Sequence, residues 1–336
     1  MLKETISKLA RRENLTKSEA LEAMNDIMSG ETPDSLIAAF LMGLRTKGET
    51  VEEIAGCALS MRDHAVKIRS KQDHVIDTCG TGGDGSGTFN ISSTAAIIAS
   101  AGGATVAKHG NKAVSSACGS ADLLSALGVK IDINAEHAEK VLNEVGITFL
   151  YAPLMHGAMK YAMNVRKQLG MRTVFNILGP LTNPAGAKRQ VIGVFQRELT
   201  ETMAAVLAEM HAEHALVVHG EGGLDEFSIL GKTRISELSK GKVKTYEIDA
   251  EDLGFRKAVI KDIQGGSVEE NVDIVRGILD GKTGAPTEIA VFNGGAALYV
   301  SGVAGSIKEG ISLAQDIVRD GRAKRKLDDW IQATNT

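Results

Sequence analysis

The stretch DTCGTGGDGSGTFNISS, residues 77–93, combines five glycines with a row of hydroxyl side chains. Glycine lets the backbone approach a ligand closely, and N–H groups in such a loop before a helix bind phosphate oxygens. No Asp or Glu occurs from Gly85 through Ala121, as expected where a carboxylate would repel an anion. The stretch therefore predicts a site for a phosphate-bearing ligand.

A second loop has the same character. The segment AKHGNKAVSS, 107–116, follows an apolar run and supplies Lys108 and Lys112, and GSAD, 119–122, begins a predicted helix with Ser120. Either loop alone is also compatible with a structural glycine turn or a solvated basic loop. Two such loops at successive strand ends indicate a ligand with phosphate at more than one place.

Three acids accompany these loops. Asp84 lies inside the glycine-rich stretch, and Asp225 and Glu226 follow the apolar run 215–220. A pair of neighbouring acids is more often a solvated turn, but acids beside phosphate need a cation between them. Mg²⁺ held by Asp225 and Glu226 together with phosphate oxygens is the simplest explanation.

Two common nucleotide-binding motifs are excluded by spacing. GTGGDG, 80–85, fits GxGxxG, but the acid expected about twenty residues later is missing. GKT occurs at 231–233 and 281–283, yet Glu226 and Arg276 stand where a P-loop requires glycine. The glycine loop therefore belongs to another class of phosphate site.

The composition of the 336 residues is that of a soluble protein with a sizeable core, because 43% are hydrophobic. The net charge of −4 gives no general attraction to nucleic acid or membrane. Three cysteines without CxxC spacing favour a reducing, cytoplasmic setting over disulfides or zinc. The N-terminus lacks a signal-peptide pattern, and no apolar run predicts a membrane span.

The first seventy residues predict a small helical module. TKSE at 16–19 and TVEE at 50–53 match the capping box, and Thr32 precedes Pro33 as a cap followed by proline at the first helical position. Gly30 and Gly48 are expected helix stops. The segment 151–187 is also mainly helical and could complete this module in space.

The rest of the chain predicts βα units around a mostly parallel sheet. Helical periodicity covers 135–146 and 198–214, which would put His211 and His214 on one solvated helix face. Capping boxes at 267–270 and 306–309 predict two late helices. The fold class is therefore α/β, with helical domain 1–70, completed by about 151–187, and α/β domain 71–336. The predicted strands are 74–78, 104–109, 189–195, 215–220 and 242–248.

Four long motifs resemble the anthranilate phosphoribosyltransferase family in order and spacing. They are GTGGDGSGTFNISS, KHGNKAVSSACGSADLLSALG, VRKQLGMRTVFNILGPLTNPA and GLDEFS, and the similarity spans nearly the whole chain. The resemblance implies a helical domain on an α/β domain and a homodimer. It also implies transfer of 5-phosphoribosyl from phosphoribosyl diphosphate (PRPP) to anthranilate in tryptophan biosynthesis.

The resemblance also implies site residues. Metal ligands would be Ser92, Asp225 and Glu226, with two Mg²⁺ per site. The residues implied to bind anthranilate are Gly80, His109, Asn111, His156, Arg166 and Pro180, with Arg166 suited to the carboxylate. The residues implied to bind PRPP are Gly80, Gly83, Asp84, Thr88, Asn90, Ile91, Ser92, Ser93, Lys108, His109, Gly110, Asn111, Lys112, Ala113, Val114, Ser115, Ser116 and Ser120.

Three positions depart from the family pattern. Lys112 stands where arginine is common, Ser93 where threonine is frequent, and Gly157 where proline is common. Lysine at 112 would lose a bidentate phosphate contact. Two alternatives share the architecture: a pyrimidine nucleoside phosphorylase, and a non-enzymatic nucleic-acid-binding relative. The motifs around Arg166 resemble the transferase, and the net charge argues against nucleic acid.

Overall fold

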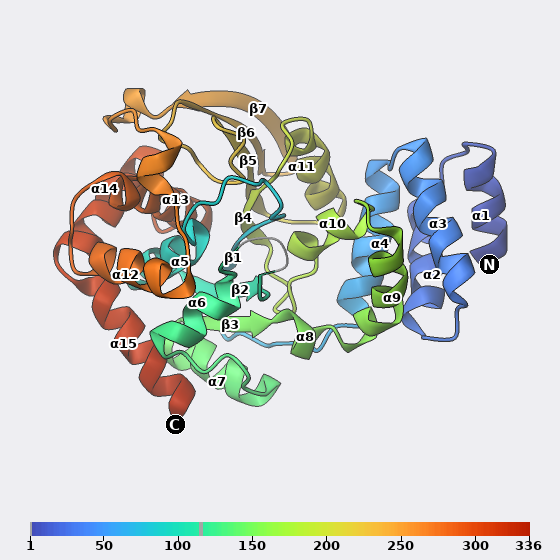
Figure 1. Cartoon of the computed structure of the whole chain (residues 1–336), viewed down its shortest axis with the longest axis horizontal. Coiled ribbons are helices and arrows are strands. Elements are labelled where there is room, and N and C mark those ends of the chain that lie inside the picture. Colours follow the sequence, from blue (N-terminus) through green and yellow to red (C-terminus); the bar gives the residue numbers. More distant parts are fainter. Residues whose placement is uncertain (1, 114–116) are drawn as a thin grey trace.

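A seven-stranded sheet forms the centre of the computed structural model, which describes residues 2–113 and 117–336 (Figure 1). The strand order is β3-β2-β1-β4-β5-β6-β7. The first five strands in this order are parallel, and β6 and β7 are antiparallel. The strands are β1 Val75–Gly80, β2 Thr105–Gly110, β3 Ile147–Tyr151, β4 Arg189–Gly193, β5 His214–Gly220, β6 Lys232–Ser239 and β7 Lys242–Asp249.

The order of the strands changes direction at β1. From β1 the chain proceeds to β2 and β3 on one side, and then returns to pair β4 with the other side of β1. Gly80 and Gly193, the last residues of β1 and β4, are direct partners. Open α/β sheets bind ligands outside the carboxyl ends of strands at such a point, so this edge is the expected site.

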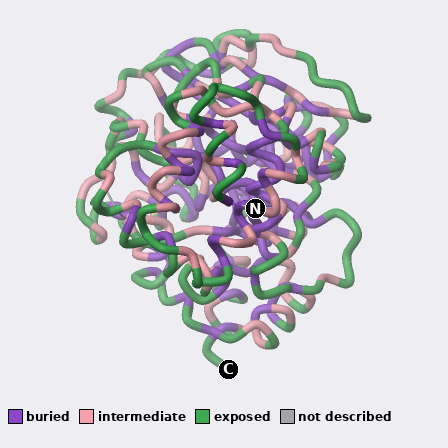
Figure 2. The backbone as a smooth tube through the Cα atoms, turned by 90° about the vertical axis from the view of Figure 1, so that its right-hand side faces the viewer, coloured by how far each residue is buried: buried purple, intermediate pink, exposed green. Residues whose placement is uncertain are grey.

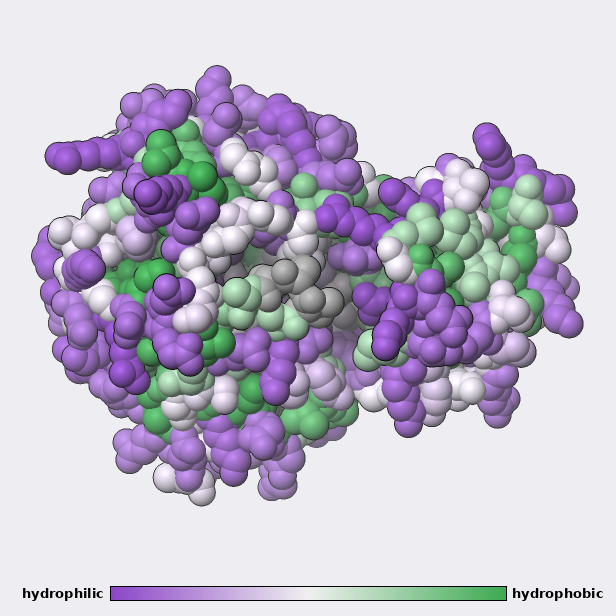
Figure 3. All heavy atoms as spheres, in the orientation of Figure 1, coloured by the Kyte–Doolittle hydropathy of each residue, from purple (hydrophilic) through white to green (hydrophobic). Residues whose placement is uncertain are grey.

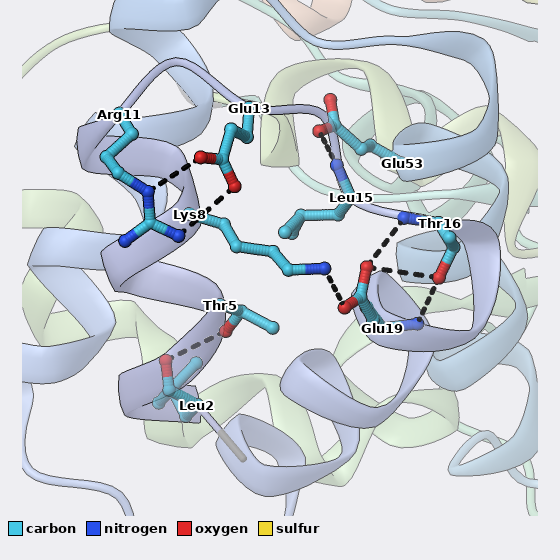
Figure 4. A network of polar contacts seen from close by, with 9 residues as sticks. All are labelled: Leu2, Thr5, Lys8, Arg11, Glu13, Leu15, Thr16, Glu19 and Glu53. Atoms are coloured by element: carbon cyan, nitrogen blue, oxygen red, sulfur yellow. Dashed lines mark hydrogen bonds and ion pairs between the residues drawn. The ribbon is translucent and has the colours of Figure 1, made fainter.

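Four N-terminal helices form a separate unit beside the sheet (Figures 1 and 3). The predicted capping boxes at Thr16 and Thr50 are confirmed. Figure 4 shows how polar contacts join the first helices: Lys8 pairs with Glu19 at 2.5 Å, and Glu53 accepts the N–H of Leu15 at 2.9 Å. The helices are α1 Leu2–Ala10, α2 Lys17–Met28, α3 Asp34–Lys47 and α4 Val51–Asp63.

The mid-chain segment joins this unit, because α9 packs against α2 and α3 and its buried Ala162 and Val165 belong to the same apolar core. That core continues onto the sheet through Ile192 and α11. The elements from the mid-chain segment to α11 are α8 Ala152–Met155, η1 Gly157–Met159, α9 Lys160–Leu169, α10 Phe175–Leu178, η2 Gly179–Leu181 and α11 Leu199–Glu209.

A second, larger core lies where the remaining helices cover the sheet. Figure 2 shows the buried backbone in the middle of the molecule and the exposed backbone around it. The predicted capping box at Ser267 is confirmed, whereas at Ser306 the Glu309 carboxylate bonds Gly305 instead. The helices are α5 Ile91–Ala101, α6 Ser120–Leu127, α7 Ala135–Val145, η3 Glu251–Leu253, η4 Ile260–Ile263, α12 Val268–Leu279, α13 Ala285–Ser301, α14 Ile307–Arg319 and α15 Arg322–Asn335. No helix in the described ranges could cross a membrane.

Some local predictions were wrong. The helix expected over 198–214 ends at Glu209, and His214 begins β5 rather than sharing a helix face with His211. The polar residues of the turn at 210–213 continue the helical periodicity, so the sequence does not show that the helix has ended there. The helix after Pro33 starts at Asp34 with Pro33 itself at the cap position. Strands β3 and β6 were not predicted from the sequence.

Glu237 on β6 is the centre of a partly buried polar cluster. Its carboxylate accepts hydrogen bonds from His214 at 3.0 Å and from the hydroxyls of Tyr246 and Tyr299 at 2.8 Å each. The hydrogen bond from His214 is the main reason that its pKa is lowered to about 2. The ionised carboxylate therefore stabilises the fold above its ordinary pKa near 4.5.

We expect Glu237→Gln to lower the free energy of unfolding at pH 7 by about 1–2 kcal/mol, because donors lose a charged acceptor. The difference between variant and parent should shrink as pH falls from about 4.5 to 2, where the parent carboxylate takes up its proton. Urea unfolding across this range measures it. A difference independent of pH would show that charge at Glu237 is not what stabilises the cluster.

Candidate functional site

The glycine loop leaves the end of β1 in a backbone conformation that requires glycine. Gly82, Gly83, Gly85 and Gly87 have φ values of 65°, 74°, 73° and 66°. Side-chain-bearing residues rarely adopt these angles. The glycines therefore determine the path of the loop as well as exposing its N–H groups.

Contacts from distant segments hold this loop. The N–H of Thr81 donates to the Gly193 carbonyl at 2.9 Å, and the Thr81 hydroxyl accepts the N–H of Phe195 at 3.1 Å. Farther along, Gly265 donates to the Gly87 carbonyl at 2.9 Å. The segment around Gly265 was not predicted as part of the site, and only its GG pair hinted at a close backbone approach.

Asp225 lies directly over the ends of β1 and β4. Its Oδ2 accepts the N–H of Gly82 at 2.8 Å. A Cβ atom on Gly80 would overlap the Asp225 carboxylate, and one on Gly193 would overlap its backbone carbonyl. The absence of a side chain at both strand ends is therefore what admits Asp225. The role of Gly193 was missed because one glycine in a strand pattern carries little signal.

Asp225 and Glu226 form a half-buried acidic pair facing the loop. Glu226 Oε1 accepts the N–H of Ser92, in the first turn of α5, at 3.0 Å. Burial raises the pKa of both carboxyls, and the charge on Asp84 further raises that of Asp225. Asp84 itself accepts the Ser86 N–H and hydroxyl at 3.2 and 2.6 Å. A cation beside the acidic pair would relieve this repulsion.

Lys108, on β2, is 2% exposed and points from its strand toward β1 and α5. Its Nζ donates to the Thr78 carbonyl and, at 3.3 Å, to the Ser92 hydroxyl. The positive charge therefore lies beside the helix N-terminus where Ser92 meets Glu226. This places a cation, a hydroxyl group and an acid close together at the start of α5.

The second predicted loop closes on itself. Gly110 ends β2, and the Ser120 hydroxyl donates to the Asn111 carbonyl at 3.2 Å. Asp122 accepts the N–H groups of Ala113 and Gly119 at 2.9 and 3.0 Å. The predicted residues Val114, Ser115 and Ser116 lie outside the described residues.

The remaining residues predicted to bind phosphate lie at the end of the glycine loop, in the first turn of α5 and in the loop after β2. Thr88 bridges to Gln264, and Asn90, at the α5 cap position, donates to the Cys118 carbonyl at 3.1 Å. Ile91 and Ser93 are buried in the first turn of α5, and the Ser93 hydroxyl has no partner among the described residues. Lys112 is exposed.

Of the residues implied to bind anthranilate, His156, Arg166 and Pro180 lie in the mid-chain segment, whereas Gly80, His109 and Asn111 lie at or beside the ends of β1 and β2. The rings of His109 and His156 are 4.9 Å apart, and both are buried. Burial lowers their pKa values to about 3 and 4, so both rings are neutral at physiological pH. Pro180 adjoins this pair through Gly179, whose backbone bonds His109. The guanidinium of Arg166 lies over the Phe175 ring at 5.1 Å.

A buried network behind these residues was not predicted. Asp77 on β1 is fully buried, and its carboxylate accepts the N–H of His109 at 3.2 Å and the amide of Asn183 at 2.7 Å. Asn183 also donates to the Ala107 carbonyl at 2.8 Å. Asp77 thus fixes β2 and the turn after Pro180 together. The sequence signal for this network was the single acid, Asp77, within the otherwise apolar predicted strand 74–78.

Comparison with known families matches almost the entire chain. Residues 72–324 match the model of the glycosyl transferase family, a/b domain, and residues 3–65 match its helical bundle domain. Among curated relatives, the anthranilate phosphoribosyltransferase of Acetivibrio thermocellus is 50% identical over 336 residues, covering 100% of this chain and 97% of its own. That of Desulfosudis oleivorans is 50% identical over 337 residues, covering 100% and 99%.

Solved structures agree with these matches. The anthranilate phosphoribosyltransferase of Thermus thermophilus superposes with a TM-score of 0.94 at 41% identity, covering 99% of both chains. The enzyme of Saccharomyces cerevisiae in complex with PRPP and Mg gives 0.90 at 29% identity, covering 99% of this chain and 98% of its own. A yeast complex with 4-fluoroanthranilate gives 0.89 at 28%, with the same coverage.

Proposed function

We infer that this chain, which belongs to the anthranilate phosphoribosyltransferase family, catalyses the reaction of that family in tryptophan biosynthesis. It transfers the 5-phosphoribosyl group of PRPP to the amine of anthranilate, giving N-(5-phosphoribosyl)anthranilate and diphosphate. The observation that carries this conclusion is the glycine loop facing Asp225 and Glu226 at the strand ends, in a chain matched over its full length.

We propose that the glycine loop and the basic loop after β2 hold PRPP. N–H groups of the loop, Lys108 and the hydroxyls at the start of α5 present donors to diphosphate oxygens. Lys112 and the loop to Ser120 supply further donors. The Ser93 hydroxyl and the Asn90 Oδ1 atom are buried and have no hydrogen-bond partner within residues 2–113 and 117–336, which supports a polar ligand at the α5 N-terminus.

The acidic pair fits Mg²⁺. Asp225 and Glu226 offer hard carboxylate oxygens, and Ser92 adds a hydroxyl beside them. The described residues hold no cluster of three or more His, Cys, Asp and Glu that would bind a metal alone, so substrate oxygens would complete the coordination, as is usual for Mg²⁺. In this position Asp225 and Glu226 would hold an ion able to neutralise charge on the diphosphate. We propose two ions per site; the yeast complex supports Mg binding.

Arg166 is proposed to bind the anthranilate carboxylate, since its planar guanidinium can form a bidentate pair. The site would also include Gly80, Asn111 and Pro180, with His109 and His156 as neutral walls of the path. Neutral imidazoles neither repel an approaching amine nor protonate it. The amine can therefore arrive in its nucleophilic form.

The chain needs no nucleophile of its own for this reaction. The C1–O bond to diphosphate breaks while the amine nitrogen bonds to C1, and the amine proton leaves to solvent. Lys108 and the loop N–H groups stabilise the negative charge on the departing diphosphate. Arg166 and the loop hold the two reactants in line, which removes much of the entropic cost of a bimolecular step.

The test is the loss of anthranilate fluorescence on mixing the purified protein, PRPP and Mg²⁺, with EDTA as the control. Loss that requires all three components, and diphosphate released in equal amount, is expected. If a folded preparation leaves anthranilate unchanged while PRPP stays intact, the assigned reaction is wrong. Phosphorolysis of pyrimidine nucleosides and salt-dependent DNA retention would then test the two alternatives.

Replacing Arg166 by alanine should raise KM for anthranilate about tenfold or more, because a charge-assisted bidentate pair is lost. KM for PRPP should change less than about twofold. Lys167→Ala, an exposed neighbour on α9, is the matched control. Steady-state kinetics with each substrate varied measures both constants. Equal effects on both substrates would place Arg166 outside the anthranilate site.

The domain division, assembly and location remain proposals. We propose a helical domain of residues 1–70 with about 151–187, supported by the core that they share, and an α/β domain of residues 71–336. Exposed apolar side chains at Leu154, Tyr161 and Met163 support a homodimer, which light scattering would test. The three cysteines, which form no disulfide, support a cytoplasmic location.

A further inference from the structure

Arg172 reaches from the helical segment to the glycine loop. It lies in the connection between α9 and α10, and its Nη2 atom donates to the Gly83 carbonyl at 2.6 Å. The same guanidinium lies over the Phe195 ring at 3.8 Å from the ring centroid. Phe195 follows the end of β4, so one side chain joins three separate parts of the chain.

Two different parts of the chain contact adjacent residues of the glycine loop. Asp225, from the α/β part, accepts the N–H of Gly82 at 2.8 Å, and Arg172 donates to the carbonyl of Gly83. Both glycines have positive φ, so the unrestrained backbone here has many accessible conformations. These two contacts select one conformation at the point where PRPP is proposed to bind.

The helical segment that supplies Arg172 also carries Arg166, the proposed anthranilate ligand on α9. Each arginine packs over an aromatic ring, Arg166 over Phe175 and Arg172 over Phe195. Within residues 166–175, Arg172 therefore contacts the glycine loop and Arg166 belongs to the proposed anthranilate site.

We propose that Arg172 is a positioning residue that fastens the glycine loop to the segment bearing Arg166, and thereby holds the loop in the shape that receives PRPP. This rests on the proposed function of the loop. The side chain is exposed, and Arg172 contacts the carbonyl of Gly83, so it does not compete with phosphate for the Gly83 N–H. Arginine suits the role because one planar group can stack and donate together.

Removing the side chain should act on binding rather than on chemistry. If the loop is receptive only part of the time, the apparent affinity for PRPP falls by that fraction. We expect Arg172→Ala to raise KM for PRPP about tenfold, with kcat and the melting temperature almost unchanged. Arg197→Ala is the control, because Arg197 is a nearby exposed arginine that pairs with Glu247 instead. Unchanged KM for PRPP, with or without a lower melting temperature, would overturn the proposal.

Two further variants separate fastening from charge alone. Phe195→Leu should raise KM for PRPP about threefold, and the double variant should match Arg172→Ala, because the ring acts through the guanidinium. Arg172→Lys keeps the charge but not the planar stacking group, so much of the loss should remain. Full recovery in Arg172→Lys, or additive effects in the double variant, would contradict the proposal.

Hydrogen exchange of the peptide 80–90 in the ligand-free protein gives a readout independent of activity. Arg172→Ala should exchange roughly five- to tenfold faster than the parent there, and Arg197→Ala should not. If the parent consumes no anthranilate, the proposed function fails while the exchange result still judges the contact. If the parent is active and exchange is the same in all three proteins, only the role of Arg172 fails.

Discussion

Replacing Asp225 by asparagine is expected to lower kcat/KM for PRPP by about a hundredfold or more, the largest effect of a single charge in this site. The variant keeps an oxygen that can accept the Gly82 N–H, so the loop should retain its shape. What is lost is one of the two half-buried carboxylates proposed to hold Mg²⁺. Steady-state kinetics at several Mg²⁺ concentrations should show that the variant also needs more metal.

Although Asp225→Asn should lower the activity, we expect it to preserve or raise the stability of the metal-free protein. Burial and then the charge on Asp84 raise the pKa of Asp225, so without metal the folded protein loses stability as pH rises from about 4 toward neutral. Asparagine removes this penalty. In EDTA near pH 8, the melting temperature of the variant should equal or exceed that of the parent.

Asp249→Asn is the matched control, because its carboxylate also accepts a backbone N–H, that of Glu251, at 3.2 Å. It should leave the rate and the metal requirement unchanged. Equal losses in the two variants, or a rate loss in Asp225→Asn explained by unfolding, would exclude Asp225 as a metal ligand.

A single methyl group at Gly193 should be nearly as damaging. Its Cβ would meet the backbone of Asp225 rather than a flexible side chain, so β4 and the acidic turn must separate. We expect Gly193→Ala to lower kcat/KM about a hundredfold and to reduce the free energy of unfolding by about 1–3 kcal/mol, typical of overpacking. Kinetics and urea unfolding measure the two effects.

Gly157→Ala provides the comparison, since a Cβ there meets nothing within 4 Å and its φ is not positive. It should change neither activity nor stability by a measurable amount. If Gly193→Ala keeps full activity, Asp225 does not depend on the packing of the two strand ends.

The positions with chemical side chains could be predicted from the sequence because they follow strand patterns. Lys108 ends up beside Ser92, and Asp225 beside the glycine loop, since parallel strands bring their carboxyl ends to one edge. The capping boxes at Thr16 and Thr50 were also predictable, because the hydrogen bonds that they predict are local in the sequence.

The partners that complete the site could not be predicted in the same way. Arg172 touches Gly83 across 89 residues of sequence, and its spacing from Arg166 says nothing about which loop it reaches. Gly193 matters only because Asp225 happens to pack on it. The end of α11 was misplaced because polar residues in the turn before His214 continue the helical period. Such contacts depend on the tertiary structure, and the neighbouring sequence does not indicate them.

The long-range hydrogen bonds that hold the glycine loop affect the order of folding. Asp225 closes a contact over 143 residues, and Gly265 bonds the loop from still later in the chain. During synthesis, which proceeds from the N-terminus, the loop emerges long before these partners. Contacts of such range form late because the intervening chain must be ordered first. A growing chain truncated before residue 265 would therefore carry the phosphate loop without the frame that shapes it, so substrate capture should begin only after most of the protein has been made.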